Sequence, residues 1–125
     1  MEKKTIVIVD DDKFLLDMYS LKFHQRGYDV FAVMTPAEAL TKLREGGMKP
    51  AIIIFDITMP VMDGITFLQT IKDENLAEES VLLALSNDSD ENSIKKCKEI
   101  GVDEYIIKAT LTPEELVEKV EKMIE

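Results

Sequence analysis

The sequence of 125 residues is poor in cysteine, in aromatic residues and in positive charge, and it has no long hydrophobic run. Its only cysteine, Cys97, cannot form an internal disulfide, and one thiol does not make a zinc site. The first apolar run, residues 5–9, is too short for the core of a signal peptide or for a membrane span. We therefore expect a cytoplasmic protein that does not insert into a membrane.

Positive charge is scarce, because 25 acidic residues stand against 15 basic ones and give a net charge of -10. A surface with this balance repels the phosphate backbone, so we expect no binding to nucleic acid. The length and the hydrophobic fraction of 46% suit one domain with one core, here residues 1–125 with no output domain. An acidic excess can also include carboxylates that gather around a cation.

Five short apolar runs alternate along the chain with segments of helical periodicity. The runs are residues 5–9, 28–33, 51–55, 81–85 and 105–107. The first, third and fourth are almost wholly apolar, as strands buried on both faces should be, whereas Asp29 interrupts the second and the fifth is short. Strict alternation predicts an α/β fold with a doubly wound, five-stranded parallel sheet. Placing the most apolar runs inside gives the strand order 2-1-3-4-5.

Several helix boundaries are marked by capping residues. Thr35 and Thr112 are each followed by a proline, which favours an N-cap with proline in the first turn. Glu115 is placed to complete a capping box with Thr112. Glu115 and Lys119 are also spaced for an ion pair along the last helix. These signals predict helices that begin near residues 36 and 113.

Carboxylates follow the two strands that border the predicted crevice. In a sheet of this order, ligands bind beyond the carboxyl ends of the first and third strands. Asp10, Asp11 and Asp12 follow the first strand, and Asp56 follows the third. An oxygen-only site of this kind suits Mg²⁺, or Mn²⁺. We expect Asp10, Asp11 and Asp56 to share a cation, and Asp12 to cap the helix that follows it.

Two further polar residues end the neighbouring strands. Ser86 follows the fourth run and Lys108 follows the fifth, so both should lie on the same rim. A hydroxyl can donate to a phosphoryl oxygen and an ammonium can neutralise its charge. A carboxylate is a recognised phosphoryl acceptor, so the set predicts phosphoryl transfer to Asp56.

These residues also carry a resemblance to a known family. Over essentially its whole length, the chain resembles the receiver domain of two-component response regulators, which has a flavodoxin-like, CheY-like fold. The matching segments are IVIVDDD (residues 6–12), FDITMPVMDG (residues 55–64), LALS (residues 83–86) and YIIK (residues 105–108). The resemblance implies a signalling domain for phosphorelay rather than an enzyme with a separate substrate. It would catalyse only its own phosphorylation and dephosphorylation.

The resemblance also implies partners and residue roles. A histidine kinase or a histidine phosphotransfer domain would phosphorylate Asp56, and the backbone carbonyl of Thr58 would complete the Mg²⁺ site. Ser86 and Lys108 would bind the phosphoryl group, and Tyr105 would turn inward. The face made by the fourth helix, fifth strand and fifth helix would then change its downstream protein partner. From the residue type alone, Tyr105 could equally be an ordinary strand aromatic.

Positions beside the site depart from the family pattern or tune it. Ala109 stands where the family usually has proline after the lysine, so the turn there should differ. Asn87 stands where a small residue is usual after Ser86, and its amide could narrow access to the phosphoryl group. Thr58 and Asp88 occupy positions that tune phosphoryl lifetime in the family. We expect Asp88 to help orient water near that group.

Three other functions remain open at this point. The first is a receiver fold that acts as an interaction module without phosphorylation. The second is a flavin-binding protein, although three aspartates stand where a flavin phosphate would want a loop rich in glycine, serine and threonine. The third is a Mg²⁺-dependent phosphohydrolase, for which 125 residues leave little room for a cap.

Overall fold

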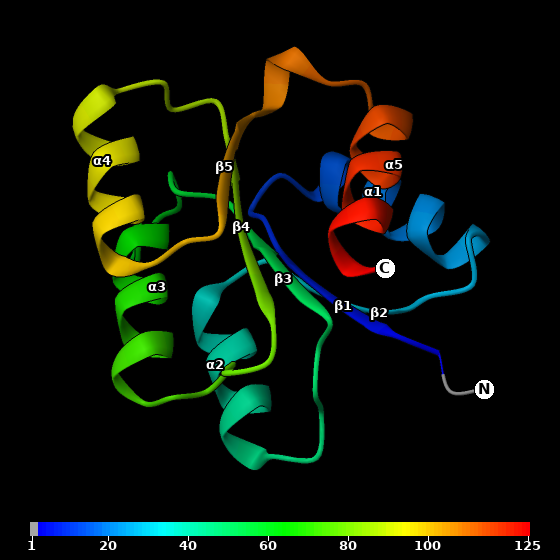
Figure 1. Ribbon diagram of the computed structural model, residues 1–125, viewed down its shortest axis with the longest axis horizontal. Helices are drawn as coiled ribbons and strands as arrows, with labels where there is room; N and C mark the ends of the chain where they lie inside the picture. The colour runs from blue at the N-terminus through cyan, green and yellow to red at the C-terminus, as the bar shows by residue number, and fades with distance from the viewer. Residues whose placement is uncertain (1–2) are drawn as a thin grey trace.

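In the computed structural model, which describes residues 3–125, strands and helices alternate from one end of the chain to the other (Figure 1). The elements are β1 (Thr5–Val9), α1 (Lys13–Gln25), β2 (Asp29–Val33), α2 (Pro36–Glu45), β3 (Ile52–Phe55), α3 (Gly64–Asp73), β4 (Val81–Ser86), α4 (Glu91–Ile100), β5 (Glu104–Ile107), a short 3-10 helix η1 (Lys108–Thr110) and α5 (Pro113–Ile124). Each predicted run matches one strand to within a residue at either end. None of these helices is long and apolar enough to cross a bilayer.

The five strands form one parallel sheet in the order β2-β1-β3-β4-β5, which confirms the predicted topology. The central strands β1 and β3 carry fully buried isoleucine and valine side chains on both faces. The edge strand β2 is only partly buried. Hydrophobicity along each strand therefore sets its place in the sheet, because only a strand covered on both faces can be apolar throughout.

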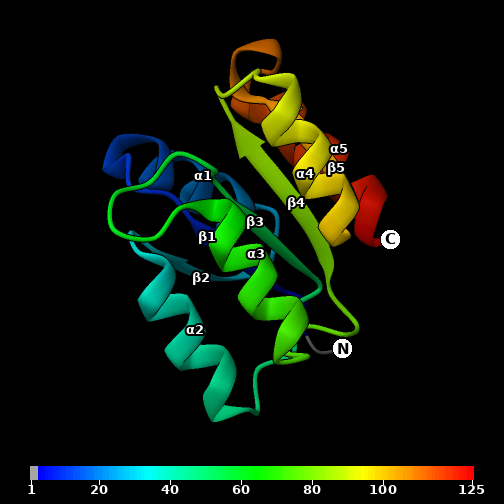
Figure 2. The same ribbon diagram turned by 90° about the vertical axis from the view of Figure 1, so that its left-hand side faces the viewer.

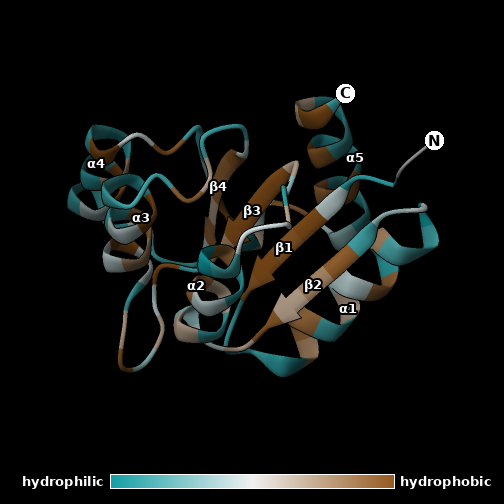
Figure 3. Cartoon of the chain, turned by 90° about the horizontal axis from the view of Figure 1, so that it is seen from below, coloured by the Kyte–Doolittle hydropathy of each residue, from teal (hydrophilic) through white to brown (hydrophobic). Residues whose placement is uncertain are grey.

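Helices cover both faces of the sheet and enclose two apolar layers. Figure 1 shows α2, α3 and α4 on one side and α1 and α5 on the other, and Figure 2 shows the first group facing the viewer. The strands are the most hydrophobic part of the chain, and polar residues mark the outer sides of the helices (Figure 3). This leaves the carboxyl ends of the strands as the place where polar side chains can enter the core.

The predicted helix caps are present. The side chains of Thr35 and Thr112 accept hydrogen bonds from the backbone three residues on, and Glu115 completes a capping box with Thr112. The predicted ion pair between Glu115 and Lys119 is wrong. The Glu115 carboxylate is used in the capping box, and the Lys119 ammonium lies 2.9 Å from Glu104 on β5 instead.

Candidate functional site

Three carboxylates meet at the carboxyl ends of β1 and β3. One oxygen from each of Asp10, Asp11 and Asp56 can be chosen so that all three atoms lie within 4.8 Å of one another. Asp10 directly follows β1 and Asp56 directly follows β3, and these two strands are neighbours in the sheet. The expectation that the acids ending the first and third strands lie together is therefore confirmed.

Burial singles out the same crevice. Among residues 3–125 the buried polar residues are Asp10, Asp56 and Ser86, with exposed fractions of 2%, 7% and 0%. They end three adjacent strands, β1, β3 and β4. Burying polar groups costs free energy unless they are paired, so three of them at one edge of the sheet mark this edge as the candidate functional site.

Lys108 joins the acids from the end of β5. Its ammonium lies 2.8 Å from Oδ2 of Asp10 and 2.8 Å from Oδ2 of Asp56, and its side chain is only 8% exposed. Burial alone would lower the pKa of Lys108. Its hydrogen bonds to the two carboxylates outweigh that effect and raise the pKa, so the side chain stays charged. The Lys108 ammonium is thus held against both buried carboxylates, at the position that the sequence predicted for it.

Backbone amides fix the other oxygens of the two buried acids. The amide of Asp12 donates to Oδ1 of Asp10 at 2.9 Å, and the amide of Thr58 donates to Oδ1 of Asp56 at 3.1 Å. The Asp12 side chain accepts a hydrogen bond from the amide of Leu15 and caps α1, as predicted. The acids at the strand ends therefore divide into a cluster in the crevice and a helix cap beside it.

Gly64 is a site residue whose importance sequence reasoning did not identify. It begins α3, and its amide donates to the carbonyl of Ile57 at 2.8 Å. A Cβ at this position would lie 2.1 Å from the carbonyl oxygen of Asp56 and 2.7 Å from Cα of Ile57. No side chain fits at that distance, so only glycine lets α3 start directly behind the proposed acceptor.

The hydroxyl side of the crevice comes from β4, β5 and the loop after β4. Oγ of Ser86 accepts a hydrogen bond from the amide of Asp88 at 3.2 Å. The hydroxyl of Tyr105 donates to the backbone carbonyl of Asp88 at 2.6 Å, so this ring is tied to the loop. Burial, together with the negative charge of Asp88, raises the pKa of Tyr105 to about 12. The Asp88 carboxylate accepts from the amide of Asp90, and its expected role with water stays a prediction.

The two unusual residues of the motif contact each other. The side-chain oxygen of Asn87 accepts a hydrogen bond from the amide of Ala109 at 3.1 Å. No cis peptide bond occurs within residues 3–125, and the turn after β5 is the 3-10 helix η1. A proline at 109 would have no amide hydrogen to donate, so this contact depends on both residues.

The acid cluster suits a divalent cation by its chemistry. Three carboxylates face one ammonium, and burial raises the pKa of Asp10 despite the hydrogen bond from Lys108, which acts in the opposite direction. A bound cation would relieve this excess negative charge. Carboxylate and carbonyl oxygens are the ligands that Mg²⁺ prefers, and Asp11 is exposed, which leaves room for water in the coordination shell.

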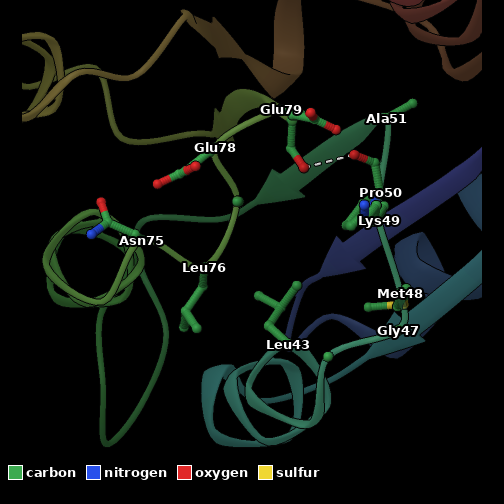
Figure 4. A pocket seen from close by; sticks show the side chains of 13 residues that line it. Leu43, Gly47, Met48, Lys49, Pro50, Ala51, Asn75, Leu76, Glu78 and Glu79 are labelled. Carbon is green, nitrogen blue, oxygen red and sulfur yellow. Dashed lines mark hydrogen bonds between the residues drawn. The ribbon is translucent and has the colours of Figure 1, made fainter.

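Within residues 3–125, the acid cluster is the one group of three or more acidic, histidine or cysteine side chains close enough to share a metal ion. A hollow of about 440 Å³ lies between the loops that precede β3 and β4, at the opposite edge of the sheet (Figure 4). Within it, the Ser80 hydroxyl donates to the carbonyl of Pro50 at 2.6 Å.

The thiol of Cys97 is fully buried, and burial raises its pKa to about 11, so Cys97 is a core residue as expected.

A family model described as "response regulator receiver domain" matches residues 6–121. The chain belongs to this family. This receiver domain is therefore a signalling domain of phosphorelay systems, which favours that function over the flavin-binding and phosphohydrolase alternatives. Receiver domains bind Mg²⁺ at an aspartate cluster, and the group formed by Asp10, Asp11 and Asp56 is such a cluster.

Similar proteins support the assignment. This receiver domain is 29% identical to the DNA-binding response regulator MtrA of Mycobacterium tuberculosis over 94% of the chain and 49% of MtrA. It is 26% identical to the regulatory protein PhoP of Bacillus subtilis over 97% of the chain and 48% of PhoP. The chain thus spans about half the length of the curated relatives it matches.

Solved structures agree with the fold. A CheY-like receiver domain from Methanospirillum hungatei is 28% identical and superposes with a TM-score of 0.88, covering 98% of this chain and 94% of that one. The BeF3-activated receiver domain of DrrB, a Thermotoga maritima protein, is 27% identical, with a TM-score of 0.81 and coverage of 97% of both chains.

Proposed function

We propose that this receiver domain accepts a phosphoryl group on Asp56 from a histidine kinase or a histidine phosphotransfer domain. An oxygen of the Asp56 carboxylate would attack phosphorus while the bond from phosphorus to the donor imidazole breaks, and its electron pair returns to that nitrogen. The observation that carries the proposal is the convergence of three carboxylates, within 4.8 Å, with the Lys108 ammonium 2.8 Å from Asp56.

Each proposed residue has a task that its position supports. Asp10, Asp11, Asp56 and the backbone carbonyl of Thr58 would hold Mg²⁺, or Mn²⁺. The cation would offset the charge of the transferring group. Lys108 would bind a phosphoryl oxygen in place of one of its two carboxylate contacts. Ser86 would donate its hydroxyl to another oxygen while its Oγ accepts from the amide of Asp88. The domain would also hydrolyse its own acyl phosphate.

The output would be a change of protein partner in the cytoplasm. The hydroxyl of Tyr105 on β5 is bonded to the loop that leads into α4, so a movement of that loop reaches β5 directly. Phosphorylation can shift the equilibrium between two arrangements only by the free energy with which it favours one of them. The face formed by α4, β5 and α5 is the proposed binding surface for a downstream protein.

The test is incubation with Mg²⁺ and acetyl phosphate, followed by intact-protein mass spectrometry. We expect the wild type to gain the mass of one phosphoryl group and the Asp56→Asn variant to gain none. Asp12→Asn is the matched control, because Asp12 lies beside the crevice but caps α1, and asparagine is an equally good cap. This variant should be phosphorylated like the wild type. A wild type that takes up no phosphate would instead support the interaction module that works without phosphorylation.

A further inference from the structure

We propose that Asn87 is a positioning residue for phosphoryl transfer, which it serves by tying the loop after Ser86 to the turn after Lys108. The inference rests on the proposed function, because it concerns the two residues that would bind the phosphoryl group. Asn87 directly follows Ser86 and Ala109 directly follows Lys108, and their hydrogen bond is 3.1 Å long. The two departures from the usual motif are thus one structural feature.

The contact begins where the strand ladder stops. Ser86 is the last residue of β4 and lies opposite Ile107, the last residue of β5. Beyond this pair the chains separate into the β4–α4 loop and η1, and backbone pairing between the two strands ends. The Asn87 side chain then bridges them with a bond that the amide of Ala109 donates. This hydrogen bond continues the connection between the two chain segments beyond the last strand pair, Ser86 and Ile107.

The turn that carries Lys108 is fixed at its start by the ion pairs of that lysine with Asp10 and Asp56, but Ala109 and Thr110 are exposed. Its internal hydrogen bonds run from the Thr110 hydroxyl to the carbonyl of Ile107 and from the amide of Leu111 to the carbonyl of Lys108. Within the described part of the chain, the bond to Asn87 is the one that joins the η1 backbone to the β4–α4 loop. With Lys108 held by the two acids, this bond fixes the next residue of η1, Ala109, relative to the loop after Ser86.

The consequence concerns rate rather than metal affinity. Lys108 must place its ammonium, and Ser86 its hydroxyl, on the same transferring group, and small misplacements of such groups slow a reaction. The Asp10, Asp11 and Asp56 carboxylates are positioned by β1 and β3 and by the amides of Asp12 and Thr58, none of which Asn87 contacts. Loss of the Asn87 bond should therefore slow phosphorylation and leave Mg²⁺ affinity unchanged.

The experiment is a double-mutant cycle with Asn87→Ala and Ala109→Pro, where the proline removes the donor. The readouts are the rate of phosphorylation by acetyl phosphate at saturating Mg²⁺ and the Mg²⁺ dissociation constant. Asn87→Ala should slow phosphorylation about fivefold, the factor that corresponds to one ordinary hydrogen bond. In the Ala109→Pro background it should change the rate by less than about twofold, because the bond is already absent. Mg²⁺ affinity should stay within about twofold throughout.

A matched control and a spectroscopic readout separate positioning from general damage. Asn92 is an exposed asparagine on α4, and Asn92→Ala should leave the phosphorylation rate unchanged. In ¹H–¹⁵N NMR spectra, the Ala109 amide signal should move in Asn87→Ala and stay in place in Asn92→Ala.

The possible contrary results are distinct. If the wild type is phosphorylated and Asn87→Ala reacts at the same rate, the inference is wrong while the proposed function stands. Rate losses that multiply in the double variant, or a parallel loss of Mg²⁺ affinity, would also overturn it. A wild type that accepts no phosphate would overturn the proposed function itself.

Discussion

The two sides of the crevice are built in different ways. The acid side consists of Asp10, Asp11 and Asp56 together with Lys108, and ion pairs of 2.8 Å join the lysine to both buried acids. The hydroxyl side consists of Ser86, Asn87, Asp88 and Tyr105, held by single hydrogen bonds along one loop. The acid side holds four charged side chains, where a cation and a phosphoryl group would bind, whereas Asp88 is the one charged side chain of the hydroxyl side.

The helices around each side differ in the same sense. On the acid side, α1, which follows Asp10, buries Leu16, Tyr19 and Phe23. On the hydroxyl side, α4 buries only Cys97. Segments with few buried apolar contacts open at a lower free energy than the rest of a domain. The comparison therefore predicts that α4 opens at a lower free energy than α1.

Removing the cation of the acid side should have the largest effect. Lys108→Met leaves Asp10 and Asp56 buried without a positive partner, and the loss of one member of a buried ion pair costs about 3 kcal/mol or more. We expect the free energy of unfolding, measured with urea, to fall by that amount without Mg²⁺. Added Mg²⁺ should restore part of it, because a cation that binds only the folded state stabilises it.

Lys119→Met is the matched control for this prediction. Lys119 pairs with Glu104 at 2.9 Å, but the two side chains are 42% and 38% exposed, against 8% for Lys108. Exposed pairs contribute about 0.5 kcal/mol, so this variant should hardly change the unfolding curve. Equal losses in the two lysine variants would contradict the claim that the acid side is a buried charge cluster.

The sequence was sufficient to predict the sheet order and the acid cluster, for a physical reason. Burial on both faces requires a continuous apolar run, and the carboxyl ends of parallel strands lie at one edge. Residues 6–9 and 52–55 therefore fixed the positions of Asp10 and Asp56 before any side-chain geometry was known. The same rule placed Lys108 at this edge, because Lys108 directly follows the fifth strand.

Contacts between loops could not be predicted in this way. The bond from Ala109 to Asn87 joins residues in two loops, where no strand or helix periodicity fixes the register. The steric role of Gly64 depends on the path of the chain behind Asp56. Lys119 had two possible carboxylate partners, and the capping box decided between them by occupying Glu115. Such choices depend on the folded backbone rather than on spacing.

Gly64→Ala should disturb the acid side without changing its charge. The new Cβ would meet the Asp56 carbonyl, so β3 or α3 must shift. We expect a loss of about 2 kcal/mol in the free energy of unfolding, as for other overpacked sites, and weaker Mg²⁺ binding because Asp56 moves.

Gly27→Ala provides the comparison for Gly64→Ala. Gly27 has a φ of +93° and open space around it, so alanine there carries only a backbone cost of about 1 kcal/mol. The Mg²⁺ affinity of the Gly27→Ala variant, measured by calorimetry, should equal that of the wild type. If Gly64→Ala also binds Mg²⁺ normally, then the close contact does not position Asp56.

The smallest effect should come from the hydroxyl side, through Tyr105→Phe. This variant loses the bond to the Asp88 carbonyl, and we expect a loss of about 1 kcal/mol at neutral pH. The difference should shrink at high pH. The pKa of Tyr105 is raised from 10.0 to about 12, so in the wild type the unfolded chain loses its proton first and stability falls as the pH rises through this range. Phenylalanine cannot ionise, so the Tyr105→Phe variant does not show this fall in the free energy of unfolding.

Tyrosinate absorbance can follow this titration directly, because the chain has three tyrosines and no tryptophan. Burial raises the pKa of Tyr19 as well, so the absorbance change near pH 12 should become smaller in Tyr105→Phe rather than vanish. It should persist in Tyr28→Phe, whose hydroxyl lies 3.3 Å from Glu121. A wild type in which Tyr105 titrates near 10 would mean that its ring does not rest against the β4–α4 loop. Tyr105 would then be an ordinary strand aromatic, and the hydroxyl side would have no link from the site to β5.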